Sequence, residues 1–283
     1  MKKTVFTVEL QVGASKLTFE ILEGEGLTLF SLDNSGKKVA NDIYSLAKGV
    51  TYRDIRGGFK KEEKDLFNLD VGCTTVTSQT KRKKVKDIIK KASVFYEMLP
   101  QEISQLIEIP DKYFAKSVGE LPTFMQSKLA LIDTLSDGKR VVVVLDVFGN
   151  GEQKDKLTDF ILAKKSKEVT YIVATDDIKL ATLSTKAVVL EDGKVVEYGR
   201  VQKVLKSPIH PYAKWLIETI KKGKSSIVWR KASGKIKKHA CKYALNCPYA
   251  GADCLKKVSF VNYDKFEYAN CYLATEKLDK QKE

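Results

Sequence analysis

Four cysteines near the C-terminal end are the residues of this 283-residue chain best suited to chemistry: Cys241, Cys247, Cys254 and Cys271. Four thiolates gathered on irregular backbone form a ligand set for a tetrahedral metal ion or for an iron–sulfur cluster. Zinc sites usually bring their cysteines in pairs separated by roughly two to four residues, and this tail contains no such pair. The wider spacing favours a cluster, because its four irons are spread over a larger cube. Zinc and unligated thiols stay as alternatives.

The composition is strongly basic, with 50 Lys and Arg against 36 Asp and Glu, a net charge of +14. The densest clusters are residues 81–84 and 221–238. Such an excess can attract phosphates, nucleic acid, anionic lipid or an acidic partner, although a solvated lysine-rich face is the simpler interpretation. No zinc-finger, RNA-recognition or helix-turn-helix signature accompanies the charge, so nucleic acid is a disfavoured partner.

Apolar residues make up 43% of the sequence, which is an ordinary share for a soluble globular protein. The apolar run at 141–145 is far shorter than the roughly 18 residues that a membrane-spanning helix needs. The first residues, Met1-Lys2-Lys3, lead into an alternating pattern and not into the apolar block of a signal peptide. We therefore expect a soluble, cytoplasmic protein.

Alternating strand and helix patterns must position these residues. Period-two patterns and short apolar runs predict strands near 5–10, 17–22, 27–30, 141–145, 169–173 and 187–191. Patterns with a period near 3.6 predict helices near 38–46, 85–99, 103–109, 125–135 and 154–164. The fold class is therefore α/β: a parallel-centred core with an N-terminal antiparallel β-subdomain and a reduced helical lobe at about 50–120. We assign residues 1–205 to this domain and residues 206–283 to a Cys-rich extension, predicted to be an appendage and not a continuation of the sheet.

Three consecutive segments carry a resemblance to a known family. Residues 188–199 read VVLEDGKVVEYG, which is similar to the strand, Gly hairpin and closing strand at the end of the nucleotide-binding core of ABC ATPases. Residues 207–216 read SPIHPYAKWL and resemble the start of the C-terminal extension in the oligopeptide and dipeptide transporter ATPases. The pattern C-x5-C-P-Y-A-x3-C from Cys241, with Cys271 downstream, resembles the tail of that branch. The resemblance implies a P-loop NTPase core and a [4Fe–4S] cluster in the tail.

The same resemblance places a phosphate loop at residues 31–38, SLDNSGKK, between a strand and a helix. Gly36 and Lys37 match the family, whose glycine-rich turn wraps phosphates and whose lysine reaches them. Ser31 and Asn34 stand where the family has glycines, and Lys38 replaces the hydroxyl that holds Mg²⁺. Asp33 adds a negative charge beside the loop. We expect ATP binding to be disfavoured, and an ordinary strand–helix turn is the alternative interpretation.

Three further family motifs are altered. Residues 121–126, LPTFMQ, occupy the place of the signature loop, where Phe124 fills the space of a glycine. Asp146 ends the buried strand at the Walker B position and could contact a Mg²⁺-bound water. The next residue, Val147, stands where the family has the glutamate that polarises the attacking water. Asp176 stands where the family's switch histidine meets the γ-phosphate.

These losses predict a degenerate ATPase with no catalytic residues, in which Gly36, Lys37 and Asp146 are vestigial nucleotide-binding residues. The favoured function is a structural or regulatory partner of an active ABC-type ATPase subunit in a multi-subunit complex. Membrane permease subunits are further expected partners, and they would place the chain on the cytoplasmic face of a membrane. A component of an ATP- and electron-dependent complex that matures a metalloenzyme is the first alternative. A basic nucleic-acid-binding protein is the second.

Overall fold

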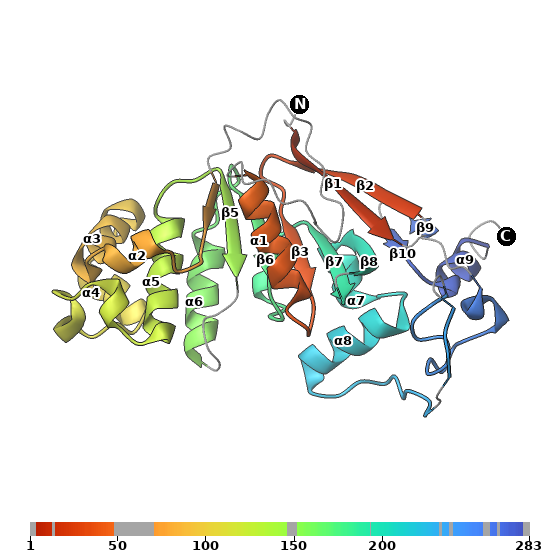
Figure 1. Cartoon of the computed structure of the whole chain (residues 1–283). Helices are drawn as coiled ribbons and strands as arrows, with labels where there is room; N and C mark the ends of the chain where they lie inside the picture. Colours follow the sequence, from red (N-terminus) through yellow and green to blue (C-terminus); the bar gives the residue numbers. More distant parts are fainter. Residues whose placement is uncertain are drawn as a thin grey trace.

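The computed structural model describes residues 4–12, 15–47, 71–145, 152–192, 194–231, 234–237, 240–256, 261–264 and 267–279 (Figure 1). Its strands are β1 (Thr4–Val12), β2 (Ser15–Leu22), β3 (Leu27–Phe30), β4 (Val71–Cys73), β5 (Val141–Leu145), β6 (Thr170–Ala174), β7 (Lys186–Glu191), β8 (Lys194–Arg200), β9 (Val261–Asp264) and β10 (Glu267–Ala269). Its α-helices are α1 (Ser35–Ala47), α2 (Ser78–Arg82), α3 (Val85–Tyr96), α4 (Pro100–Leu106), α5 (Thr123–Leu135), α6 (Glu152–Ala163), α7 (Val201–Lys206), α8 (Pro211–Lys222) and α9 (Tyr272–Asp279). None of these helices is long and apolar enough to cross a membrane.

The main sheet has the strand order β4-β5-β6-β3-β7-β8-β10-β9. The pairs from β4 to β7 are parallel, and those from β7 to β9 are antiparallel. The sheet is therefore mixed, and the predicted α/β class is confirmed. β1 and β2 pair with each other in a separate two-stranded antiparallel sheet, as predicted for the N-terminal β-subdomain.

Strand β5 explains why the central strands read as unbroken apolar runs. Val143 faces one buried cluster, which also contains Val39 and Ile43 of α1. Its neighbours Val142 and Val144 face a second cluster, which contains residues of α3, α5 and α6. Because both faces of the strand are covered, every position is apolar and the two-residue alternation disappears.

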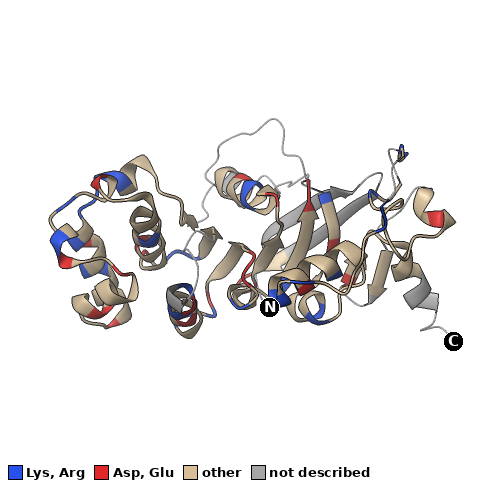
Figure 2. Ribbon diagram, turned by 90° about the horizontal axis from the view of Figure 1, so that it is seen from below, with Lys and Arg blue, Asp and Glu red and all other residues tan. Residues whose placement is uncertain are grey.

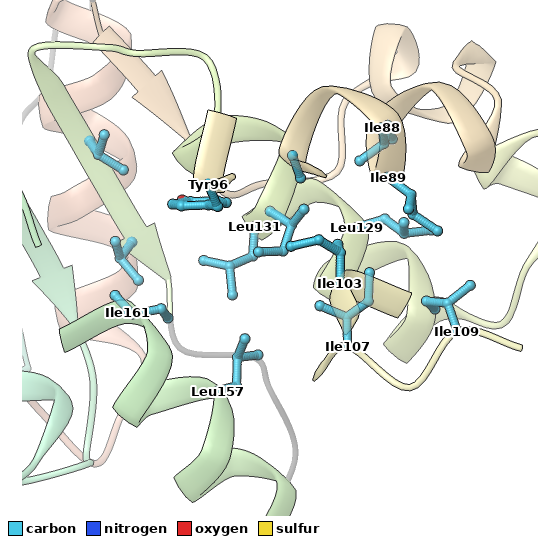
Figure 3. Packing of buried hydrophobic residues seen from close by; sticks show 14 of the residues in the cluster. Ile88, Ile89, Tyr96, Ile103, Ile107, Ile109, Leu129, Leu131, Leu157 and Ile161 are labelled. Carbon is cyan, nitrogen blue, oxygen red and sulfur yellow. The ribbon is translucent and has the colours of Figure 1, made fainter. Parts of the chain in front are cut away.

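The helical lobe packs on the second of these clusters, at the left of Figure 1. Its interior is a layer of fully buried aliphatic side chains, among them Ile89, Ile103 and Leu129, with Leu157 of α6 facing them (Figure 3). At its rim Asp133, which is nearly buried, pairs with the amino groups of two lysines, Lys83 and Lys91.

Two helices of the lobe have other bounds than predicted: α3 ends earlier, and the helix predicted near 103–109 is α4, Pro100–Leu106. Helix α3 ends at Tyr96 and not near 99, because Glu97 adopts the left-handed conformation with φ of 55°. Pro100 then begins α4, where the missing N–H of proline is tolerated in the first turn. Strand β4 lies within the range assigned to the lobe but pairs with β5 in the main sheet. The domain boundaries themselves stay a prediction.

The C-terminal residues extend the main sheet, so the predicted appendage is wrong. Strand β10 pairs with β8 through Tyr268 opposite Tyr198 and Ala269 opposite Glu197, and β9 pairs with β10 in turn. β10 is only three residues long, so its own sequence pattern carries little strand signal. Its pairing depends on β8, an element about 70 residues earlier in the chain.

A carboxylate that is fully buried, Glu197 on β8, ties the extension to the core. It accepts hydrogen bonds from the backbone N–H groups of Ile209 (3.0 Å) and His210 (2.8 Å). The hydroxyl of Tyr263 on β9 donates a third, at 3.0 Å. The side chain of Glu197 therefore connects β8 to the turn before α8 and to the edge strand β9.

We predict that Glu197→Ala lowers the free energy of unfolding by about 3 kcal/mol or more, because buried donors left without an acceptor cost about 1–3 kcal/mol each. Glu197→Gln retains one carbonyl acceptor and should lose about half as much. Urea denaturation checks this, with the exposed Glu168→Ala as the control, expected within about 0.5 kcal/mol of the parent. A Glu197→Ala protein as stable as the control would contradict the assignment.

Candidate functional site

The predicted phosphate loop lies at the carboxyl end of β3, a central parallel strand, and leads into α1. Ligands of open α/β sheets bind at this end of the strands. Gly36 donates its N–H to Ser31 Oγ at 2.9 Å. A Cβ atom at Gly36 would lie 3.0 Å from the carbonyl oxygen of Leu29, so only glycine fits without displacement. Asn34 has φ of +50°, a left-handed conformation that asparagine tolerates better than most residues.

The carboxylate of Asp33 occupies the mouth of this loop. It accepts hydrogen bonds from the backbone N–H of Ser35 at 3.2 Å and from its hydroxyl at 2.6 Å. Its other oxygen accepts the N–H of Asp192, in the turn between β7 and β8, at 2.8 Å. Burial would raise the pKa of Asp33, but the hydrogen bonds from Ser35 and Asp192 outweigh it and hold the pKa below its usual value. The loop thus binds an anion that it carries itself.

The structure describes only some of the other nucleotide-site positions. Lys37 lies half-buried in the first turn of α1 beside Gly36, and Lys38 is exposed. Asp146 and Val147 lie outside the described residues. Asp176, at the switch position, is exposed and lies 3.6 Å from the amino group of Lys154.

At the signature position α5 begins at Thr123, directly after Pro122. Phe124 stands 55% exposed in the first turn of this helix. The bulky ring is therefore at the surface, where the family's small residues face a partner's phosphate.

The four tail cysteines line one small cavity, together with His210, Tyr243 and Tyr272. Cys241 and Cys254 are joined through their backbone, N–H to carbonyl, at 3.1 Å. The Tyr249 N–H lies 3.4 Å from the sulfur of Cys247. The sequence-predicted cysteines are therefore brought together, on turns and at the start of α9.

The polar side chains that line this cavity are those of the four cysteines, His210 and three tyrosines. Burial raises the pKa of Cys241 to about 11 and that of Cys271 to about 12. Burial also raises the pKa of Cys247. Within the described ranges no three His, Cys, Asp or Glu side chains lie close enough to share a single metal ion.

His210 also lines this cavity, which its place in the segment 207–216 did not predict. Its Nδ1 accepts the N–H of Tyr212 at 3.0 Å and so caps α8. Complete burial lowers the pKa of His210 to about 3, so the ring is neutral. Nε2 must then carry the proton, and it lies 3.9 Å from the Cys241 sulfur. The His-Pro-Tyr segment that resembles the family marked this part of the chain in the sequence. The spacing between His210 and Cys241 along the chain did not predict that the two side chains meet.

A lysine next to the first cysteine connects the cavity to the phosphate loop. The amino group of Lys242 pairs with the carboxylates of Asp192 and Glu191, the latter at 3.2 Å. Asp192 is also the residue whose N–H binds Asp33. The turn between β7 and β8 thus contacts both candidate sites.

The chain is similar to known proteins. Residues 196–254 match the family described as the oligopeptide/dipeptide transporter C-terminal region. An ABC transporter ATP-binding protein of Methanocaldococcus jannaschii is 23% identical over 202 residues, which cover 67% of this chain and 72% of that protein. The dipeptide transport ATP-binding protein DppF of Lactococcus lactis is 23% identical over 240 residues, covering 74% and 76%. The match to DppD of Caldanaerobacter subterraneus is 28% identical but covers only 40% of this chain and 37% of that protein.

A solved ATP-binding subunit of an ABC transporter superposes with a TM-score of 0.50 at 13% identity, covering 71% of this chain and 92% of that one. At this identity the likeness concerns the fold alone. The predicted P-loop NTPase core of the ABC ATPase type, with its mixed sheet, is confirmed.

We predict that Asp33→Gly creates an ATP site that the second substitution Lys37→Ala removes. Without the carboxylate, the N–H groups of Ser35 and Asp192 become available to phosphate and a like charge is gone. We expect at least a tenfold gain in affinity, about 1.4 kcal/mol, measured by calorimetric titration with Mg²⁺-ATP. Asp33→Asn, which removes the charge but still fills the loop, should lie between.

The exposed Asp111→Asn controls for the overall change in charge and should leave the titration unchanged. An Asp33→Gly protein that binds ATP no better than the parent would show that the carboxylate does not block the loop.

Proposed function

We propose that this chain, a member of the oligopeptide/dipeptide family of ABC transporter ATP-binding proteins, is a non-hydrolysing subunit that pairs with a catalytically intact ATP-binding subunit. The observation that carries the proposal is the Asp33 carboxylate, which accepts the N–H of Ser35 at the start of α1 and the N–H of Asp192 in the turn between β7 and β8. A carboxylate there repels the like-charged γ-phosphate and competes for the same donors.

Two further positions support the loss of hydrolysis. The family's attacking water needs a carboxylate next to Asp146, and the sequence has Val147, which can neither accept a proton nor orient water. At the switch position, Asp176 brings a negative charge where an imidazole would meet the nucleotide. The chain therefore supplies scaffold to the pair, while the partner supplies the chemistry.

The helical lobe offers a surface for the membrane subunit of such a complex. Val94 is 74% exposed, and Leu99 is 64% exposed. Phe95 adds a half-exposed ring between them in sequence. Large apolar side chains that stay exposed are candidates for interaction with a partner. We assign these residues to contact with a permease subunit at the cytoplasmic face of a membrane.

The cysteine cavity fits a [4Fe–4S] cluster better than zinc. Its four candidate ligands, Cys241, Cys247, Cys254 and Cys271, are all sulfur, as clusters prefer. The tail lacks the closely spaced cysteine pairs that are usual in zinc sites, whereas four irons at the corners of a cube hold thiolates further apart than one ion does. A bound cluster would supply a redox-active iron centre and crosslink the tail. His210 would donate its Nε2 hydrogen toward the Cys241 sulfur, a contact of the kind that orients ligands and tunes a metal centre.

The basic composition does not favour the nucleic-acid alternative. Figure 2 shows Lys and Arg interspersed with Asp and Glu on both the helical lobe and the sheet region. Nucleic-acid interfaces need cationic residues gathered along one face. Most of the lysines are thus better explained as part of a solvated surface; those beside α7 line a cavity.

We predict that the purified chain shows negligible ATP hydrolysis at saturating Mg²⁺-ATP, because the water-polarising carboxylate is missing and Asp33 fills the loop. Phosphate release checks this, with an intact dipeptide-transporter ATP-binding subunit as the positive control. Turnover by the isolated chain near ordinary enzyme rates, about 1 s⁻¹ or faster, would overturn the non-hydrolysing assignment.

We predict that anoxically purified protein contains iron and sulfide in equal amounts, and that Cys247→Ser loses most of both together with the brown colour. Removing one of four thiolates opens the cage and exposes the cluster to solvent. The matched control is Cys73→Ser, which alters a buried cysteine on β4, in the core and outside the cavity. Zinc without sulfide in the parent, or full iron in Cys247→Ser, would contradict the cluster assignment.

A further inference from the structure

A second cavity lies at the amino-terminal edge of the parallel strands, opposite the phosphate loop. Its walls come from the end of β2, the segment before β3, the turn before β7, and α7. Its volume is about 1180 Å³, slightly above the roughly 300–1,000 Å³ typical of small-molecule sites. Strand β3 has four residues, so the two edges are about 13 Å apart at 3.3 Å per residue. This cavity is therefore a separate place from the loop that holds Asp33.

The charged groups that face this cavity are almost all cations. Among the described residues they are Lys165, Lys186, Arg200, Lys203 and Lys206, against the carboxylate of Glu25. Lys186 pairs with Glu25 at 2.8 Å, and Arg200 pairs with the buried Glu267 at 2.6 Å. Lys165 and Lys206 add positive charge to the cavity beyond these pairs.

Two of these lysines have no acidic partner among the described residues. The amino group of Lys165 is hydrogen-bonded only to the carbonyl oxygen of Leu183. Burial lowers the pKa of Lys165, as expected for an ammonium group held without a counter-charge. Lys206 is exposed at the end of α7 and reaches the same cavity. A bound anion would supply the missing partner for both.

The rest of the wall provides a hydroxyl group and two aromatic rings. Ser184, which is 3% exposed, carries a hydroxyl that is buried and has no hydrogen-bond partner. The rings of Tyr198 and Tyr268 lie 5.9 Å apart along one side. Phosphate groups are recognised by ammonium groups together with hydroxyl donors, and aromatic faces suit the organic part of a ligand.

We propose that this cavity binds a phosphorylated small molecule with several negative charges, held by Lys165 and Lys206 at its phosphates. The position away from the phosphate loop means that such a ligand would bind as an effector or structural anion and not as an ATPase substrate. The site stands independently of the non-hydrolysing function, because none of its residues belongs to the nucleotide motifs or to the cysteine cavity.

Calorimetric titration of the full chain with sodium tripolyphosphate in about 0.15 M salt tests the proposal. We expect saturable binding of one ion, and an affinity at least tenfold weaker in the double variant Lys165→Gln/Lys206→Gln. The single Lys206→Gln, at an exposed position that cannot disturb the core, should weaken binding at least threefold. Lys37→Ala, in the phosphate loop, should leave the affinity unchanged.

The matched control for non-specific attraction is Lys222→Gln/Lys256→Gln, which removes two exposed charges outside the cavity. Three results would overturn the proposal: no saturable binding by the parent, equal loss in the control double variant, or loss on Lys37→Ala instead. Binding of a poly-glutamate peptide in preference to tripolyphosphate would also overturn it, since the cavity would then serve an acidic protein segment.

Discussion

The junction between sheet and tail depends on the buried carboxylate of Glu197. An ionised group taken out of water is tolerated only where donors replace its hydration. Here two backbone N–H groups and the hydroxyl of Tyr263 do so. One of those N–H groups belongs to His210, which caps α8 and faces the Cys241 sulfur. The geometry of the cysteine cavity therefore starts from a polar interaction in the core, and the cavity cannot keep its shape if β8 moves.

The phosphate loop shows the same chemistry with the opposite consequence. Backbone N–H groups at the start of a helix attract an anion, and whichever anion is present at the highest effective concentration will occupy them. Asp33 is attached to the loop by the chain itself, so its carboxylate is always at hand, whereas a nucleotide must arrive from solution. The loop therefore differs from the family pattern in two ways. It lacks some of the family's residues, and it carries a carboxylate, Asp33, that competes with phosphate for the N–H of Ser35.

Sequence patterns located the elements whose signal is local. The apolar run at Val141–Leu145 predicted β5, and the four cysteines predicted a shared site, since their residue type limits the chemistry. Contacts between distant segments were not accessible in this way. The bond from Asp192 to Asp33 spans 159 residues, and β10 pairs with a strand about 70 residues earlier in the chain. The tail was therefore mistaken for an appendage, and the role of Asp33 was recognised only as an unfavourable charge.

The turn between β7 and β8 contacts both candidate sites. Lys242 holds the carboxylates of Glu191 and Asp192 from the tail side, while the Asp192 N–H holds Asp33 from the other. Any rearrangement at Cys241 that withdraws Lys242 acts on the same turn that keeps the loop closed. Linkage is reciprocal, so opening of the loop would in turn loosen the lysine. With the proposed iron centre in the tail, the state of that centre and the conformation of residues 31–38 would be coupled through this one turn.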